Sequence, residues 1–202
     1  MYLRVLPVAV LALALGGCVT AAVNTLHVDQ IASLRLAGVN VAVAPDARIG
    51  WGDGGRAYAA SKGVPADQSN TVANTPEARA YMRNTIGSKV KAAMERHLGG
   101  KLTGSRPVRV EVAVKEVTIP SVVQRVLVGG HHTMTADVTL VDARTGAVII
   151  AYSGQRTAAM TGQGVAGVLV ESVAAGDPVD RVVDNYAAQY SFWLRRMDER
   201  TP

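Results

Sequence analysis

Four valines that alternate with other residues over 108–114 constrain the fold of this chain more than any other feature. A period of two places these side chains on one face of a β-strand, so the stretch predicts a strand with one buried and one wetter face. The apolar positions move to odd numbers at Val117 and Ile119, which predicts a β-bulge near Glu116. Pro120 is expected to end the strand.

A further strand with the same alternation is predicted at 134–140, and a third strand of this set at 148–152. The intervening residues 142–146 read Asp-Ala-Arg-Thr-Gly, and the glycine can adopt the positive φ that such a turn requires. These strands are therefore expected to form a β-hairpin. A shorter strand is predicted at 39–43, where three valines alternate before a proline.

Two amphipathic helices are predicted beside these strands. Thr75-Pro76-Glu77 opens the first, because threonine caps, proline suits the first helical position and glutamate suits the positive end of the helix dipole. Asp177-Pro178 opens the second by the same pattern. Each start is followed by an apolar stripe at helical spacing: Ala78, Met82, Ile86, Val90, Ala93, Met94 and Leu98 in the first helix, and Val179, Val182, Val183, Tyr186, Ala187, Tyr190, Leu194 and Met197 in the second.

The order of these elements predicts an α+β fold of two layers. A mixed or antiparallel sheet of about four strands is expected, covered on one face by the two main helices. The chain of 202 residues is long enough for one domain, which we place at 39–202. Residues 46–75 lack a sustained apolar period and are predicted to form a long loop, either disordered or functional. A short helix is predicted near 165–175.

The first eighteen residues fit an export signal. Arg4 supplies positive charge, residues 5–15 form an apolar stretch too short to cross a bilayer, and Gly16-Gly17 supply small side chains before Cys18. Cys18 is the only cysteine, which excludes an internal disulfide framework and a multi-cysteine metal site.

Leu15-Gly16-Gly17-Cys18 resembles the lipobox of bacterial lipoproteins. The resemblance implies that residues 1–17 are removed as a signal peptide, that the Cys18 thiol carries diacylglycerol, and that 18–38 form a lipidated tether. Such an anchor is durable, since each buried CH₂ contributes about 0.8 kcal/mol. Val19 stands where aspartate signals inner-membrane retention in many such proteins, so the resemblance implies the periplasmic face of the outer membrane. The alternative is an ordinary signal peptide followed by a free or buried cysteine.

The charge of the chain is mild and dispersed. The net charge is +5, and removal of Arg4 with the leader leaves 20 basic and 16 acidic residues, a net charge of +4. A nucleic-acid interface would require a denser basic stripe and more aromatic residues for stacking. Arg195-Arg196 is an adjacent basic pair, but Asp198 and Glu199 follow it closely. We therefore expect a solvated surface of mixed charge and no nucleic-acid partner.

Two motifs that could carry chemistry are weak. Gly50-Trp51-Gly52-Asp53-Gly54-Gly55 matches the glycine pattern of dinucleotide-binding turns, but Gly63 and Pro65 interrupt the segment after it, so no helix is expected there. A glycine-rich surface loop is the better interpretation. His131-His132 would point to opposite faces of a strand, where they rarely bind one metal ion together. We predict no catalytic residue, no metal site and no cofactor.

The segment 121–130 is the most interesting candidate for function, because apolar residues surround one arginine and lead into two glycines. Such a connection either packs into the core, as an extra strand or a covered segment, or serves as an apolar contact for a partner or a membrane surface. We favour the first interpretation. Under the second, the partner-contact candidates are Val122, Val123, Arg125, Val126 and Leu127.

Residues 125–130, together with the Val-x-Leu-x-Asp-x-x-Thr-Gly strand and turn at 138–146, resemble a family of uncharacterised bacterial lipoprotein domains. The resemblance covers about residues 108–156. It implies a small periplasmic α+β domain with no established activity, and it supplies no catalytic residues.

We therefore predict an outer-membrane-anchored lipoprotein that acts by contact, as a non-catalytic accessory or scaffold in an envelope assembly, transport or secretion complex. The expected partners are the membrane, through the lipid, and an envelope protein. The alternative is a cell-wall-binding or hydrolytic enzyme with a site near 46–75. An enzyme requires carboxylates or a Ser/Lys pair converging in a pocket beside that segment, and a contact protein requires an exposed apolar patch near 122–128. A closed apolar pocket would instead indicate a small-ligand binder.

Overall fold

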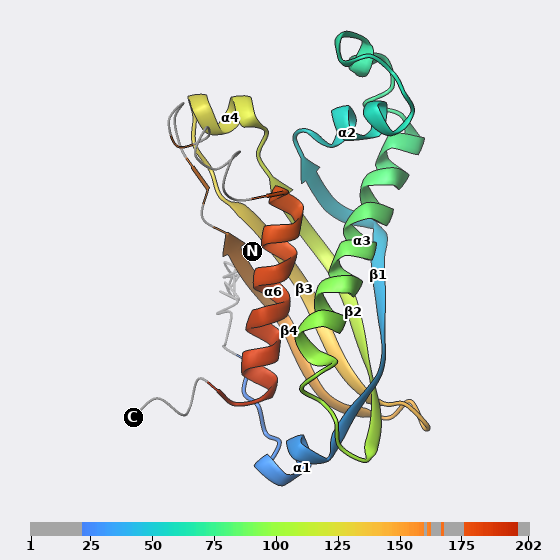
Figure 1. The fold of residues 1–202 in the computed structure, drawn as a ribbon, viewed down its shortest axis with the longest axis vertical. Helices are drawn as coiled ribbons and strands as arrows, with labels where there is room; N and C mark the ends of the chain where they lie inside the picture. Colours follow the sequence, from blue (N-terminus) through green and yellow to red (C-terminus); the bar gives the residue numbers. More distant parts are fainter. Residues whose placement is uncertain (1–21, 160, 163–166, 168–175, 198–202) are drawn as a thin grey trace, which may run out of the picture.

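The computed structural model describes residues 22–159, 161–162, 167 and 176–197 (Figure 1). The predicted leader, Cys18 and most of the predicted helix at 165–175 lie outside the described residues. None of the helices in the described part of the chain combines the length and the hydropathy needed to span a bilayer.

The centre of the fold is a four-stranded mixed sheet in the order β1-β2-β3-β4. The strands are β1 (Leu34–Trp51), β2 (Arg106–Ile119), β3 (His132–Asp142) and β4 (Val148–Ala159). β1 runs parallel to β2, and the other neighbours are antiparallel. The parallel pair requires a crossover, which the helices between β1 and β2 provide. The predicted hairpin at 142–146 joins β3 to β4 and is confirmed.

Two long helices, α3 (Pro76–Leu98) and α6 (Pro178–Leu194), lie over one face of the sheet (Figure 1). Their predicted caps are present. Thr75 accepts a hydrogen bond from the backbone N–H of Ala78 at 3.2 Å, and Asp177 accepts one from Val179 at 2.8 Å. The predicted α+β fold with helices packed on an open sheet is therefore confirmed.

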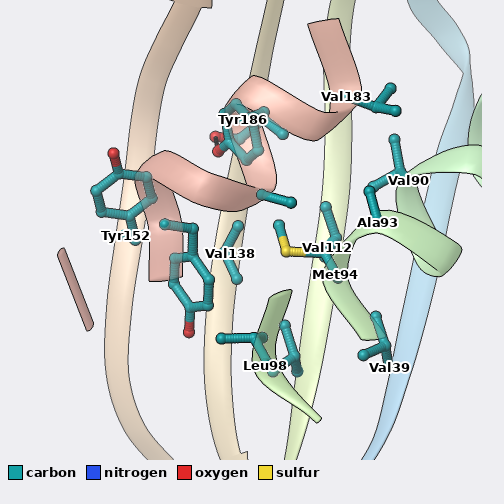
Figure 2. Packing of buried hydrophobic residues seen from close by; sticks show 14 of the residues in the cluster. Val39, Val90, Ala93, Met94, Leu98, Val112, Val138, Tyr152, Val183 and Tyr186 are labelled. Atoms are coloured by element: carbon teal, nitrogen blue, oxygen red, sulfur yellow. Dashed lines mark hydrogen bonds between the residues drawn. The ribbon is translucent and has the colours of Figure 1, made fainter. Parts of the chain in front are cut away.

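The core lies between this helical layer and the sheet (Figure 2). The even-numbered valines of 108–114 are buried, and burial moves to Val117 and Ile119 after a register shift between Val114 and Glu116. The predicted bulge is therefore confirmed. Tyr186 of α6 donates a hydrogen bond from its hydroxyl to the carbonyl of Ala136 at 2.7 Å, which ties the helical layer to β3.

The described part of the predicted tether is not a linker but part of the folded domain. Residues 28–33 form the helix α1 (Val28–Ser33), and β1 begins at Leu34, which is 1% exposed. The Asn24 side chain donates to the carbonyls of Trp193 and Leu194, both at 2.9 Å. These contacts join positions about 170 residues apart, so no local pattern at 22–38 predicts them.

Residues 46–75 are also more ordered in secondary structure than the prediction of a long loop. β1 continues to Trp51 and is followed by α2 (Gly54–Ser61) and the 3₁₀ helix η1 (Ala66–Thr71). Pro45 does not end β1, because it lies on an edge strand within a register shift, where the missing N–H leaves no ladder bond unmade.

Candidate functional site

The connection between β2 and β3 folds as a short helix, α4 (Val122–Leu127), and exposes apolar side chains, so the favoured interpretation, an extra strand or a segment packed into the core, was wrong. Ser121 caps it by accepting a hydrogen bond from the N–H of Gln124 at 3.2 Å. The Gln124 side chain in turn accepts one from the N–H of Ser121 at 2.8 Å. This reciprocal capping box satisfies two backbone donors and defines where the helix begins.

The end of β1 fixes the position of α4. A Cβ atom added to Gly52 would lie 2.5 Å from the backbone nitrogen of Ser121, so only glycine permits this approach. The next residue, Asp53, accepts a hydrogen bond from the N–H of Val122 at 3.2 Å and also pairs with Arg56. One carboxylate thus joins the starts of α2 and α4.

In α4 the apolar side chains face the solvent and the arginine is buried, which is the reverse of an ordinary surface helix. Val123 and Leu127 are 57% and 76% exposed, and Val128, which follows the helix, is 87% exposed. Arg125 is only 5% exposed. We use the term α4 surface for the four exposed apolar residues, Val122, Val123, Leu127 and Val128.

Not all of the predicted contact residues lie on this surface. Val122, Val123 and Leu127 are exposed, Val126 is half-buried, and Arg125 is buried. Arg125 is therefore removed from the set of contact residues. The alternation of apolar and charged residues could not show this, because six residues form too little helix for a stripe to indicate which side faces the protein.

Two glycines close the α4 segment. Gly129 has a φ of 82° and donates its N–H to the carbonyl of Gln124 at 3.1 Å, as expected for a helix that ends in a left-handed residue. Gly130 has a φ of 134°, and its position beside the ring of Pro120 leaves little room for a side chain. The backbone turns at these two glycines before β3 begins at His132.

A groove of about 470 Å³ lies between α4 and the ends of β1 and β2. Its lining is uncharged: it combines the Trp51 ring with the polar side chains of Thr118 and Gln124 and with apolar and glycine positions. The remaining lining residues are Ile49, Gly50, Gly52, Ile119, Pro120, Val128 and Gly129. Such a groove fits an apolar or neutral hydrogen-bonding segment better than a charged one.

A second groove of about 530 Å³ adjoins the other side of residues 46–75. Arg56 and Asp67 are its charged lining residues, and the rest are polar, small or apolar. Hydrolysis by paired carboxylates needs a second carboxylate beside Asp67, and a Ser/Lys pair needs a lysine. The lining residues of the two grooves next to 46–75 include neither. Of the two geometries that the sequence predictions set against each other, the exposed apolar patch is the one found.

The glycine motif at 50–55 has a structural explanation. A helix, α2, does follow it, so that expectation was wrong. The motif is not a free surface loop either, because Gly54 is buried against Met82 and a Cβ atom on Gly55 would lie 2.5 Å from that of Ala73. Met82 and Ala73 therefore pack against these glycines, which gives the glycines a structural role.

The two histidines lie at the start of β3 and differ in burial. His131 is exposed and His132 is fully buried. Across residues 22–159, 161–162, 167 and 176–197, no group of three metal-ligating side chains comes together. His97, at the end of α3, lies 2.9 Å from the carboxylate of Asp184, a contact that joins α3 to α6.

A third groove, which the sequence predictions missed, lies where the described chain begins. It has a volume of about 520 Å³ and lies beside Ala22 and the last turn of α6. Phe192 and Met197 line it and are 52% and 38% exposed, and Val23 next to Ala22 is 77% exposed. We use the term α6 surface for Val23, Phe192 and Met197. Phe192 is not part of the apolar stripe that was predicted to be buried. This was the sequence signal that could have indicated an exposed aromatic residue here.

No protein-family model matches the chain, and no curated protein matches it. Among solved structures, it is similar to a candidate lipoprotein from Caulobacter crescentus (15% identity, TM-score 0.35), over 57% of this chain and 85% of the other. A Xanthomonas campestris protein of family DUF330 has 12% identity and a TM-score of 0.41 over 91% and 97% of the two chains. A PelC variant dodecamer from Paraburkholderia phytofirmans has 18% identity and a TM-score of 0.31 over 78% and 92%. The functional interpretation therefore depends on the geometry of this chain.

Proposed function

We propose that this protein is a lipoprotein of the outer membrane, facing the periplasm, that acts by contact rather than catalysis. It would serve as an accessory or scaffold in an envelope assembly, transport or secretion complex. The observation that carries the proposal is the α4 surface, a helix that exposes its apolar side chains and buries its arginine.

The energetics of α4 support a partner. Covering a valine or leucine side chain contributes about 1.5–3 kcal/mol when burial is complete, so four such residues left in water represent a substantial unused driving force. The capping box and the close approach of Gly52 fix where α4 begins, and in this position its apolar residues face the solvent. A partner with an apolar, uncharged face would bury the α4 surface and fill the neutral groove beside it.

Site-specific crosslinking in cells tests the contact. A photoreactive residue at Leu127, 76% exposed on α4, is expected to give discrete adducts with one envelope protein. Val148, 66% exposed at the start of β4, is the matched control and should give none. Val123→Asp should reduce the Leu127 adducts. Equal adducts at both positions, or none at Leu127, would contradict the proposal.

The anchor requires a separate experiment. Cys18→Ser is expected to move the protein from the detergent phase to the aqueous phase in a phase-separation assay, because the thiol that would receive diacylglycerol is gone. Mass spectrometry of the unmodified sequence should show an acylated N-terminal cysteine. A Cys18→Ser protein that stays in the detergent phase would refute lipidation at this position.

A further inference from the structure

The α6 surface lies at the point where the chain leaves the predicted anchor. Phe192 and Met197 line the groove together with Ala22, from the opposite end of the sequence, and the exposed Val23 follows Ala22 in the chain. In Figure 1 this region lies at the C-terminal end of α6, whereas α4 lies near the N-terminal end of the same helix. The two exposed apolar surfaces are therefore at opposite ends of α6.

The first described residues are held firmly on the end of α6. Asn24 donates to the carbonyls of Trp193 and Leu194, and the indole N–H of Trp193 donates to the carbonyl of Ala22 at 2.6 Å. Arg196 adds a hydrogen bond to the carbonyl of Leu26 at 3.3 Å. The position of Ala22 relative to Phe192 and Met197 is thus fixed by the fold.

This attachment limits how far the α6 surface can be from the lipid. Cys18 and Ala22 are separated by four peptide units, which span at most about 14 Å when fully extended. An acylated Cys18 lies at the bilayer interface, so the α6 surface must lie within reach of the same leaflet. A phenylalanine, a methionine and a valine exposed at this distance are side chains that bury readily at the boundary between headgroups and acyl chains.

We propose that the α6 surface rests on the lipid leaflet that carries the anchor, and so orients the domain on the membrane. The proposal rests on the lipidation proposed above and adds a second, non-covalent contact to it. α6 has 17 residues and is therefore about 25 Å long. With its C-terminal end on the leaflet, α6 holds the α4 surface away from the lipid, towards a partner in the periplasm.

The orientation can be tested on the mature lipidated protein in vesicles. Acylation consumes the only native cysteine, so an introduced cysteine is the only free thiol for an environment-sensitive fluorophore. Phe192→Cys places the probe on the α6 surface, and Val123→Cys places it on the α4 surface as a matched control. With brominated acyl chains in the vesicles, we expect a blue shift and strong quenching for the probe at 192, and neither for the probe at 123.

The two tryptophans provide a second measurement without an introduced label. Trp193 borders the groove of the α6 surface and Trp51 borders the groove beside α4. In brominated vesicles, Trp51→Phe, which retains Trp193, should be quenched several-fold more than Trp193→Phe, which retains Trp51.

Each outcome separates the two proposals. An acylated protein whose probe at 192 shows no shift or quenching, or whose two probes respond equally, would overturn the orientation and leave the anchor intact. A blue shift at 192 without quenching by the brominated chains would assign the surface to self-association instead. An unacylated Cys18, found by mass spectrometry, would overturn the anchor and the orientation together.

Discussion

The two ends of α6 expose apolar residues by different physical means. At the α4 end, a six-residue helix that exposes apolar side chains is bounded by backbone features: the capping box at Ser121, the close approach of Gly52 and the positive φ of Gly129. At the other end, the exposed Phe192 and Met197 lie beside a packed aromatic cluster. The comparison teaches that one surface depends on local backbone geometry and the other on long-range side-chain packing.

The aromatic cluster consists of Tyr152, Tyr186, Tyr190 and Trp193. The ring centroids of Tyr152 and Trp193 are 4.5 Å apart, and those of Tyr190 and Trp193 are 5.8 Å apart. Burial raises the pKa of the Tyr190 hydroxyl well above its usual range, with a smaller contribution from Tyr152, so the Tyr190 hydroxyl stays neutral in any physiological medium. The sequence of α4 contains no aromatic residue, so this helix has no comparable ring packing of its own.

The largest expected effect comes from removing the centre of this cluster. Trp193→Ala should lower the free energy of unfolding by about 3–5 kcal/mol, because a nearly buried indole leaves a cavity and the carbonyl of Ala22 loses its donor. Trp51→Ala, at the α4 end, should cost less because Trp51 is only half-buried. Urea unfolding of both variants measures the difference. Equal losses of unfolding free energy would contradict the view that only the α6 end depends on side-chain packing.

Gly52→Ala tests the backbone framework of α4. The added methyl group would clash with the backbone of Ser121, so we expect a loss of about 1–3 kcal/mol and weaker crosslinking from Leu127. Gly38→Ala is the matched control on the same strand, because nothing lies within 4 Å of a Cβ at that position. The control should be neutral or slightly stabilising. A stable Gly52→Ala protein with unchanged crosslinking would show that α4 does not depend on this contact.

The hydroxyl groups of two tyrosines in α6, Tyr186 and Tyr190, test how the aromatic cluster is stabilised. Tyr186→Phe removes the hydrogen bond to Ala136 and should cost about 1 kcal/mol. The Tyr190 hydroxyl is buried, and no hydrogen-bond partner for it is found among the residues that the structure describes. Tyr190→Phe should therefore be neutral or stabilising by up to about 1 kcal/mol, since it removes an uncompensated polar group. Thermal unfolding distinguishes them, and a costly Tyr190→Phe would point to a missing partner.

The smallest expected effect lies between the two ends, at the link from α3 to α6. Partial burial opposes ionisation of Asp184, but hydrogen bonds from Arg96 and His97 outweigh it and lower the pKa of the carboxyl. A carboxyl whose pKa is lower in the folded state than in the unfolded state stabilises the protein at every pH above the unfolded pKa, which is near 4. This stabilisation is lost as the pH falls through the pKa of the folded state.

Asp184→Asn should therefore reduce stability at neutral pH by less than about 1 kcal/mol, because the carboxylate is partly exposed to solvent. The difference from the unmodified protein should shrink as the pH falls below about 4. Unfolding curves at several pH values measure it, and a difference that persists at low pH would assign the effect to packing. Neither exposed surface should change.

The candidate site was only partly readable from the sequence. The apolar residues around Arg125 singled out 121–130, and the Ser-x-x-Gln pattern of Ser121 and Gln124 was a helix-start signal that could have predicted α4. The burial of Arg125 could not be predicted, because a six-residue helix is too short for its sequence pattern to indicate which side faces the protein. For the α6 surface, the sequence signal was Phe192, an aromatic residue outside the predicted buried stripe of the helix.

The sequence by itself determined the sheet strands from 108 to 152, the two long helices with their caps, the bulge near Glu116 and the hairpin at 142–146. These features depend on side-chain period and on turn and cap residues, which act between near neighbours in the chain. Only the tertiary structure decided that Asn24 joins the end of α6, that residues 46–61 extend β1 and form a helix, and that α4 turns its apolar side outward. Each of these depends on contacts between segments far apart in sequence, whose approach no local pattern records.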